Sequence, residues 1–162
     1  NMFTEYKNLP NNSRVWMYQS DRVFTNQEVE FISEKATAFI EQWTRHGDNL
    51  KGSFTIKYNQ FLVLAVDENF NNVSGCSIDA SVRFVKELEN ELQIDLMNKL
   101  NVSFKDGNNI NIVKLADFQK FAKEQKITKE TIVFNNMVQT KEEVENNWEI
   151  PASKSWHNRF IN

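Results

Sequence analysis

The chain has 162 residues, of which 40% are hydrophobic and 12% aromatic, and this composition supports a packed core and argues against global disorder. Its net charge is −3 and no basic run exceeds two residues, so we expect no nucleic-acid partner. One cysteine, no apolar leader segment and a longest apolar run at residues 61–66 predict a soluble cytoplasmic protein, with no membrane insertion and no disulfide-linked partner.

The first predicted elements are a strand and a long helix. Residues Arg14–Tyr18 are rich in strand formers and follow a turn-like segment. Thr25 and Glu28 have the spacing of a capping box, which predicts a helix that begins at this point. An apolar face follows, and Gly47 is expected to end the helix. That face consists of Val29, Ile32, Phe39, Ile40 and Trp43.

A hairpin is predicted next. Apolar and polar residues alternate over 54–58, which indicates a strand with one face in solvent. Asn59-Gln60 is the expected turn, and the continuously apolar Phe61–Val66 is expected to be a central strand buried on both faces.

The second half of the chain repeats this alternation of strands and helices, which predicts an α+β fold: a mainly antiparallel sheet with about four helices packed on it. We expect one compact unit, or two abutting halves at 1–101 and 102–162. The expected elements are a helix from about Asp79 to Leu92, a hairpin around Asp106-Gly107, a helix containing Leu115 and Phe118, a strand at Thr131–Phe134 and a helix capped by Thr140 and Glu143.

Nearly the full length of the chain resembles short uncharacterised bacterial proteins that carry the label "ABC transporter ATPase". The stretches that carry the resemblance are "RVWMYQ", "FIEQWTRHG", "SGCSID", "TIVFNN" and "SWHNRF". The label implies ATP hydrolysis, which requires a phosphate-binding loop and a strand that ends in acidic residues.

Two stretches imitate these ATPase motifs. Phe61–Val66 is followed by Asp67-Glu68, and Gly47–Ser53 has the glycine spacing of a phosphate loop. However, Ser53 occupies the position where the loop needs Lys, and the segment joins a helix to a strand rather than a strand to a helix. We therefore expect no ATPase activity, no cofactor and no metal site.

Cys76 is the main candidate for chemistry. It lies near the start of a predicted helix, a position at which protein thiolates are stabilised, and His46 or His157 would be the base, with Asp79 as a possible orienting group. The alternative is a small residue buried at the helix start, with Ser77 or Asp79 as the N-cap. We favour the second interpretation and predict a buried, slowly reacting thiol.

The aromatic C-terminal segment is a candidate binding surface. Trp156, His157, Arg159 and Phe160 combine residue types that are enriched at the centres of interfaces. The alternative, which we weigh above it, is a tail that packs two of its rings onto the sheet.

Residues 104–134 partly resemble bacterial GYF-type adaptor domains, in a strand with Asp-Gly, a helix, "KIT" in a turn and a strand ending in Val-aromatic. Such domains bind proline-rich peptides, and the resemblance implies that Phe134 faces a ligand.

These observations predict a non-enzymatic module that binds a protein or peptide. The alternative is a small enzyme that uses Cys76 as nucleophile with His46 or His157 as base.

Overall fold

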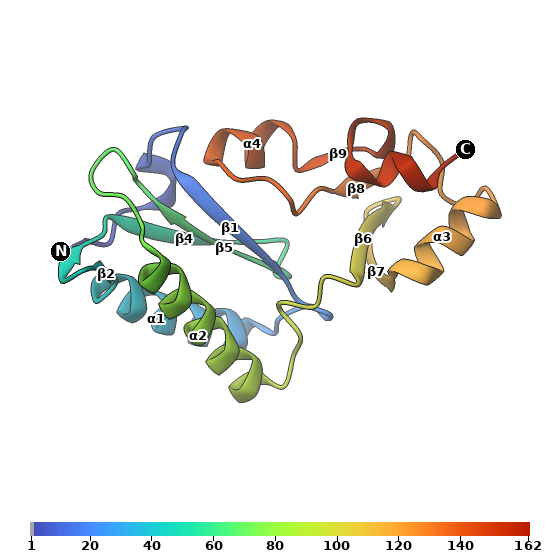
Figure 1. The fold of residues 1–162 in the computed structure, drawn as a ribbon. Helices are drawn as coiled ribbons and strands as arrows, with labels where there is room; N and C mark the ends of the chain where they lie inside the picture. The colour runs from blue at the N-terminus through green and yellow to red at the C-terminus, as the bar shows by residue number, and fades with distance from the viewer. Residues whose placement is uncertain (1) are drawn as a thin grey trace. The chain divides into compact units, whose positions relative to one another are not determined.

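The computed structural model describes residues 2–162, which divide into two compact units (Figure 1). Unit 1 extends to Met97 and also contains Gln139–Glu142, whereas unit 2 contains Asn98–Val138 and Glu143–Asn162. All strand pairs of the described residues are antiparallel, apart from one parallel bridge, and α-helices accompany them in both units. The predicted α+β class is thus confirmed. None of the helices in residues 2–162 has the length and hydropathy that a membrane crossing requires.

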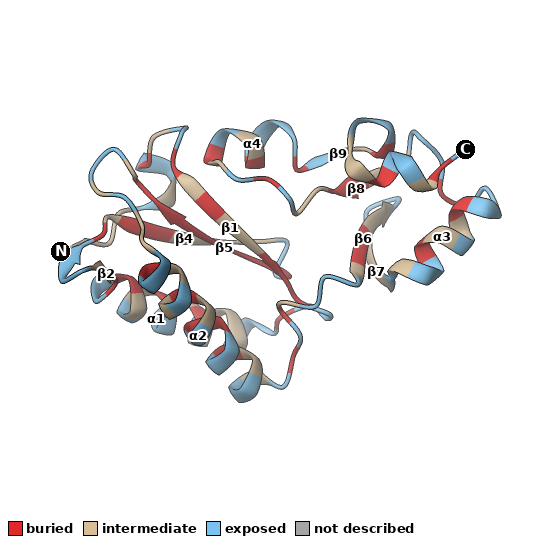
Figure 2. Cartoon of the chain, in the orientation of Figure 1, coloured by how far each residue is buried: buried red, intermediate tan, exposed pale blue. Residues whose placement is uncertain are grey.

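Unit 1 is built on a three-stranded sheet in which the central strand is completely buried. The strand order is β1 (Arg14–Gln19), β5 (Phe61–Val66) and β4 (Gly52–Lys57). Every β5 residue has 0% of its surface exposed, as its continuous apolar run predicted. The helices α1 (Asn26–Glu41) and α2 (Gly75–Leu92) lie on one face of this sheet (Figure 1), and their buried sides are red in Figure 2.

The start of α1 is as predicted, but its end is not. The Glu28 N–H donates to Thr25 Oγ1 and the Thr25 N–H donates to Glu28 Oε1, which completes the capping box. The helix ends at Glu41, and residues 44–49 turn back as a short hairpin of β2 (Thr44–Arg45) and β3 (Asp48–Asn49). The prediction that Gly47 ends the helix is therefore wrong.

The reason for the early end lies in Trp43. The Trp43 indole N–H donates to the Ser77 carbonyl at 2.9 Å, and the Trp43 carbonyl accepts from the Leu50 N–H at 3.0 Å. Both bonds take the chain out of the helical path, while Trp43 still packs on the side where the apolar pattern placed it.

Helix α2 begins earlier than expected. Ser74 is the N-cap, with a reciprocal box to Ser77, so the predicted N-caps Ser77 and Asp79 are wrong. The Ser77 hydroxyl instead donates to the Thr44 carbonyl at 2.9 Å, which fastens α2 to the hairpin of β2 and β3.

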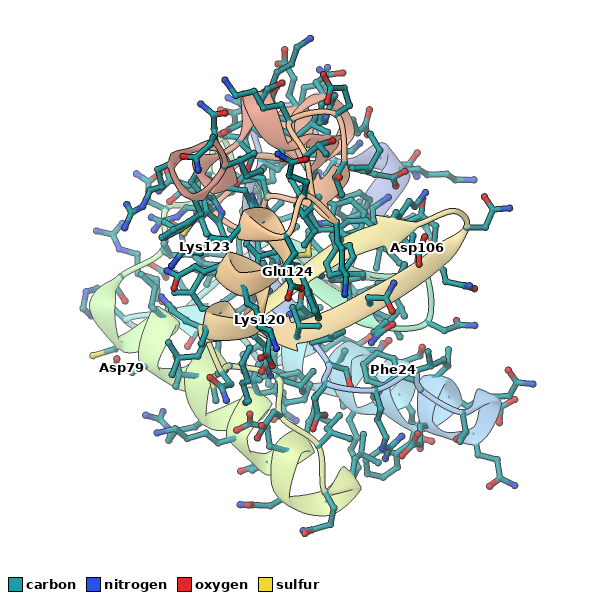
Figure 3. The ribbon with its side chains drawn as sticks, turned by 90° about the vertical axis from the view of Figure 1, so that its right-hand side faces the viewer. Phe24, Asp79, Asp106, Lys120, Lys123 and Glu124 are labelled. Carbon is teal, nitrogen blue, oxygen red and sulfur yellow. The ribbon has the colours of Figure 1, made fainter. Side chains whose placement is uncertain are left out.

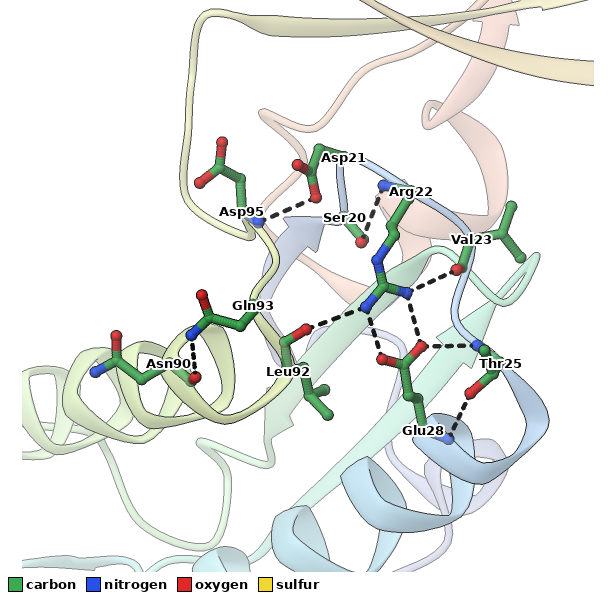
Figure 4. Close-up of polar contacts among 10 residues, drawn as sticks. All are labelled: Ser20, Asp21, Arg22, Val23, Thr25, Glu28, Asn90, Leu92, Gln93 and Asp95. Atoms are coloured by element: carbon green, nitrogen blue, oxygen red, sulfur yellow. Dashed lines mark hydrogen bonds and ion pairs between the residues drawn. The ribbon is translucent and has the colours of Figure 1, made fainter.

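A polar cluster connects the start of α1 to the end of α2 (Figure 4). Arg22 donates two 2.7 Å hydrogen bonds to the Glu28 carboxylate and one to the Leu92 carbonyl. The hydrogen bonds from Arg22, and then that from the Thr25 backbone, lower the pKa of Glu28 from 4.5 to about 2. Because Arg22 is largely exposed, we expect the ion pair to stabilise unit 1 by no more than about 1 kcal/mol.

The segment Gln139–Glu142 belongs to unit 1 because it is bonded to the N-terminal part of the chain. The Val15 N–H donates to the Gln139 carbonyl at 3.0 Å. The buried Lys141 ammonium donates to the carbonyls of Leu9 and Lys7 at 2.8 and 3.1 Å and lies over the Tyr6 ring. These carbonyls replace the water that the charge loses on burial.

Unit 2 is a four-stranded sheet with one longer helix. The order of strands is β7 (Asn109–Lys114), β6 (Asn101–Asp106), β8 (Ile132–Phe134) and β9 (Glu149–Pro151). Helix α3 (Leu115–Lys123) supplies Phe118 and Ala122 to the core. The short helix α4 (Lys141–Asn146) precedes β9, and a 3-10 helix, η3 (Trp156–Phe160), closes the chain. The C-terminal segment is thus part of unit 2.

Candidate functional site

Cys76 is exposed, which contradicts the prediction of a buried thiol. Because α2 begins at Gly75, Cys76 occupies the second helical position, and it is the next residue, Ser77, that is buried. Among the described residues, no hydrogen bond links Cys76 to a histidine. The structure therefore presents an accessible thiol in the first turn of a helix.

The other residues proposed for a cysteine enzyme lie on three different elements. His46 is exposed in the turn between β2 and β3, with φ of +50°. Asp79 is exposed on the outer side of α2 (Figure 3). His157 belongs to unit 2 and is completely buried. Within residues 2–162, no three His, Cys, Asp or Glu side chains lie close enough to hold a metal ion.

The two ATPase-like stretches have structural roles. Asp67 Oδ1 accepts from the Asn69 N–H at 3.0 Å, and Asp67 Oδ2 lies 3.9 Å from Lys51 Nζ. Glu68 accepts from the Val73 N–H. Gly47 lies in a hairpin turn and Gly52 begins β4, so the two glycines frame β3 rather than a phosphate loop.

Most of the predicted aromatic binding surface is part of the core of unit 2. Phe134, which the resemblance implies faces a ligand, is 1% exposed and packs on Trp148 with ring centroids 4.9 Å apart. Trp156 and Phe160 are half-buried and pack edge to face at 6.3 Å. Only Arg159 is exposed, with its guanidinium over the Phe160 ring.

His157, which also belongs to the predicted binding set, is enclosed in unit 2. Its ring stacks on Trp156 and contacts Phe118, and Nδ1 lies 2.7 Å from Ser155 Oγ. Its Nε2 has no hydrogen-bond partner among the described residues. Burial lowers the pKa of His157 from 6.5 to about 4, so the ring is neutral at pH 7.

An unoccupied sheet edge distinguishes unit 2. Strand β7 pairs with β6 over six residues and carries no strand or bridge on its other side within residues 2–162. The two-residue loop between them has Gly107 at φ +61°, as the first central residue of a type II′ turn requires. Such a loop closes on a hydrogen-bonded pair, here Asp106 and Asn109. Successive residues of a strand direct their N–H and C=O groups to alternate sides. The N–H and C=O groups of Ile110 and Ile112 therefore point away from β6.

The side chains of this edge are sorted onto two faces. Val113 lies opposite Val102 and belongs to the core beneath α3. Ile110 and Ile112 lie opposite Lys105 and Ser103, on the other face, and both are half-buried. The edge therefore combines bare main-chain groups with two partly accessible isoleucines.

The other outer strands differ from β7. Strand β1 carries a bridge between Arg14 and Thr140, and β4 carries one between Gly52 and Phe3. Strand β9 has only three residues and ends in Pro151. Short length, proline, charge and covering segments are the ways in which proteins protect sheet edges from other chains. Within residues 2–162, residues 109–113 of β7 have no proline, no charged side chain and no bridge to another segment on their outer side.

The charged side chains near β7 lie away from the middle residues of the strand. Lys105 is paired with Glu149 at 2.6 Å, and Lys114 Nζ donates to Asn101 Oδ1 at 2.8 Å. Figure 3 shows Asp106 near the tip of the hairpin, Lys120 and Lys123 on α3, and Glu124 directly after this helix. The sequence predicted the hairpin, but the amino acids of β7 do not reveal that it is an outer strand.

Comparison of the chain with protein-family models, with curated proteins and with solved structures gave no match. The geometry of the chain itself therefore has to support any functional conclusion.

Proposed function

We propose that this chain is a non-enzymatic interaction module that binds an extended protein segment as an additional strand beside β7. The single observation that carries the proposal is the bare, uncharged edge at residues 109–113, in a molecule whose other outer strands are bridged or short. Strand addition of this kind takes affinity from main-chain hydrogen bonds and specificity from alternate side chains. Here the outward groups of Ile110 and Ile112 would supply the bonds.

The proposal is tested by selecting linear ten-residue peptides on the whole chain. We expect binders with alternating apolar residues whose affinity falls about tenfold or more with Ile112→Pro, which removes the outward N–H. Proline is tolerated where a strand N–H faces solvent, so this variant should keep its far-UV circular dichroism. Asp79→Ala, on α2 of unit 1, is the control and should bind as the wild type does. Binders that respond to Arg159→Ala but not to Ile112→Pro would move the site to the C-terminal segment.

The cysteine enzyme remains the second candidate, and the exposed position of Cys76 in the first turn of α2 is the observation that favours it. A thiol at a helix N-terminus can be activated. Nucleophilic catalysis also needs a base within hydrogen-bond reach, and neither histidine makes such a bond in the described structure. The module is therefore the better supported of the two.

A further inference from the structure

We infer that the strand that pairs with β7 is β7 of a second copy of this chain, running antiparallel about a two-fold axis at Asn111. This inference rests on the proposed function, because it names the occupant of the same edge. A closed pair of this kind uses the same surface on both copies, so that surface must be complementary to itself.

The side chains of β7 meet this requirement in one register. With the axis at Asn111, Ile110 of each copy lies opposite Ile112 of the other. Four isoleucines then gather on one face of the joined sheet, and the two Asn111 amides face each other on the opposite face. A register centred on Ile112 would instead place each Ile110 opposite a charged Lys114. Opposed apolar pairs stabilise a sheet, so the register at Asn111 is favoured.

The main-chain groups fit the same register. Ile110 and Ile112 are the residues whose N–H and C=O groups point outward, and they face each other in it. Each Ile110 and Ile112 pair can therefore exchange two hydrogen bonds, as in an antiparallel sheet. Asn111 becomes the non-hydrogen-bonded pair at the centre, where Cα atoms of the two strands approach to about 4.5 Å.

Charge favours the antiparallel direction. Lys114 is the only charged residue of β7. A parallel pair would align the two Lys114 residues side by side, and like charges directly opposite each other destabilise a sheet. The antiparallel pair separates them to opposite ends. Lys105, which lies opposite Ile110 on β6, is paired with Glu149 and so leaves the isoleucine face without an unpaired charge at that position.

The test is a disulfide across the proposed axis, made in a Cys76→Ser background so that the introduced thiol is the only one. In Asn111→Cys the two sulfurs would meet, because the Cβ atoms lie within the roughly 4 Å that a disulfide requires. The control is Asn109→Cys, the same substitution on the same face of the same strand. Its two copies would be about 14 Å apart, four residues along the strand. Oxidised glutathione takes the two electrons and two protons of the thiols and becomes two molecules of glutathione.

We expect Asn111→Cys to form covalent dimers at least tenfold faster than Asn109→Cys, and Ile112→Lys added to Asn111→Cys to remove that advantage. Sedimentation velocity of the wild type should show a dimer that grows with concentration and is weakened by Ile112→Pro. Equal cross-linking of the two cysteine variants, or a wild type that stays monomeric at every concentration, would overturn the inference. If peptides still bound in an Ile112-dependent manner, the proposed function would stand with a different occupant. If neither pairing occurred, both would fail.

Discussion

The two units share an antiparallel sheet covered by helices, but they differ in how their helices begin and in how their outer strands are covered. In unit 1, capping boxes begin both long helices and each outer strand carries a bridge. In unit 2, α3 begins at Leu115 with Lys114 as an N-cap that makes no side-chain cap bond, and β7 carries no further strand within residues 2–162. Unit 2 also encloses three polar atoms that have no partner among the described residues: Ser103 Oγ, Trp156 Nε1 and His157 Nε2.

The two units therefore differ in how the edges of their sheets are covered. Unit 1 has a fully buried central strand, and Ser13 Oγ and Arg45 Nε are buried there without a partner among the described residues. In unit 2 the outer side of β7 is left without a paired strand within residues 2–162, and an unpaired edge is a template for pairing with another chain.

The largest expected effect is the loss of a buried aromatic residue in unit 1. Trp43→Ala removes a side chain that is 2% exposed, contacts Trp16 and Phe39 and bonds to Ser77. We expect the free energy of unfolding to fall by about 3–5 kcal/mol in urea titrations. The half-buried Trp156 of unit 2 is the comparison, and Trp156→Ala should cost clearly less. Equal losses would break the contrast between the two cores.

The second effect is a pH dependence confined to unit 2. His157 has a pKa of about 4 in the folded state and 6.5 when unfolded, so between these values the unfolded chain binds more protons. Its contribution to stability is complete above pH 6.5 and is lost as the pH falls to 4, by up to about 3 kcal/mol. Urea titrations of wild type and His157→Phe at pH 7 and 4.5 would measure the difference.

Two variants delimit this prediction. His157→Phe should remove this pH dependence, because no imidazole is left at the enclosed position. Glu28→Gln should act in another window, since the stabilisation that Glu28 gives is present above pH 4.5 and is lost toward pH 2. A wild-type stability that is flat from pH 7 to 4.5 would contradict the enclosure of His157.

A smaller effect is expected at the cap of α1. Thr25→Ala removes the hydroxyl that accepts from the Glu28 N–H, and the usual cost of such a loss is about 1 kcal/mol. The midpoint of urea unfolding should decrease accordingly. Ser74→Ala offers the same test at α2, while Thr131→Ala removes the hydroxyl that accepts from the Thr128 N–H in a polar turn of unit 2. An unchanged midpoint for Thr25→Ala would show that the box does not stabilise unit 1.

The smallest effect concerns Cys76. Because the thiol is exposed, Cys76→Ser should change stability by less than about 0.5 kcal/mol. Iodoacetamide should label the folded and the unfolded protein at similar rates, and His46→Ala should not alter the pH dependence of labelling. Strong acceleration on unfolding would restore the buried interpretation, whereas a rate that depends on His46 would support the enzyme.

The sequence alone determined those features that depend on neighbouring residues. The Thr25 and Glu28 spacing predicted the start of α1, the apolar run predicted β5 as a central strand, and Asp106-Gly107 predicted the hairpin of β6 and β7. Capping boxes, turns and alternation act within a few residues, so their effects can be read along the chain.

The tertiary structure alone decided the features that depend on distant contacts. Helix α1 ends at Glu41 because Trp43 is held by Ser77, 34 residues away, and residues 139–142 join unit 1 through bonds to the N-terminal part of the chain. His157 is buried and Cys76 exposed for the same reason, since burial depends on what packs against a residue. Likewise the residues of β7 define a strand, but only the order of the completed sheet leaves its outer main-chain groups unpaired.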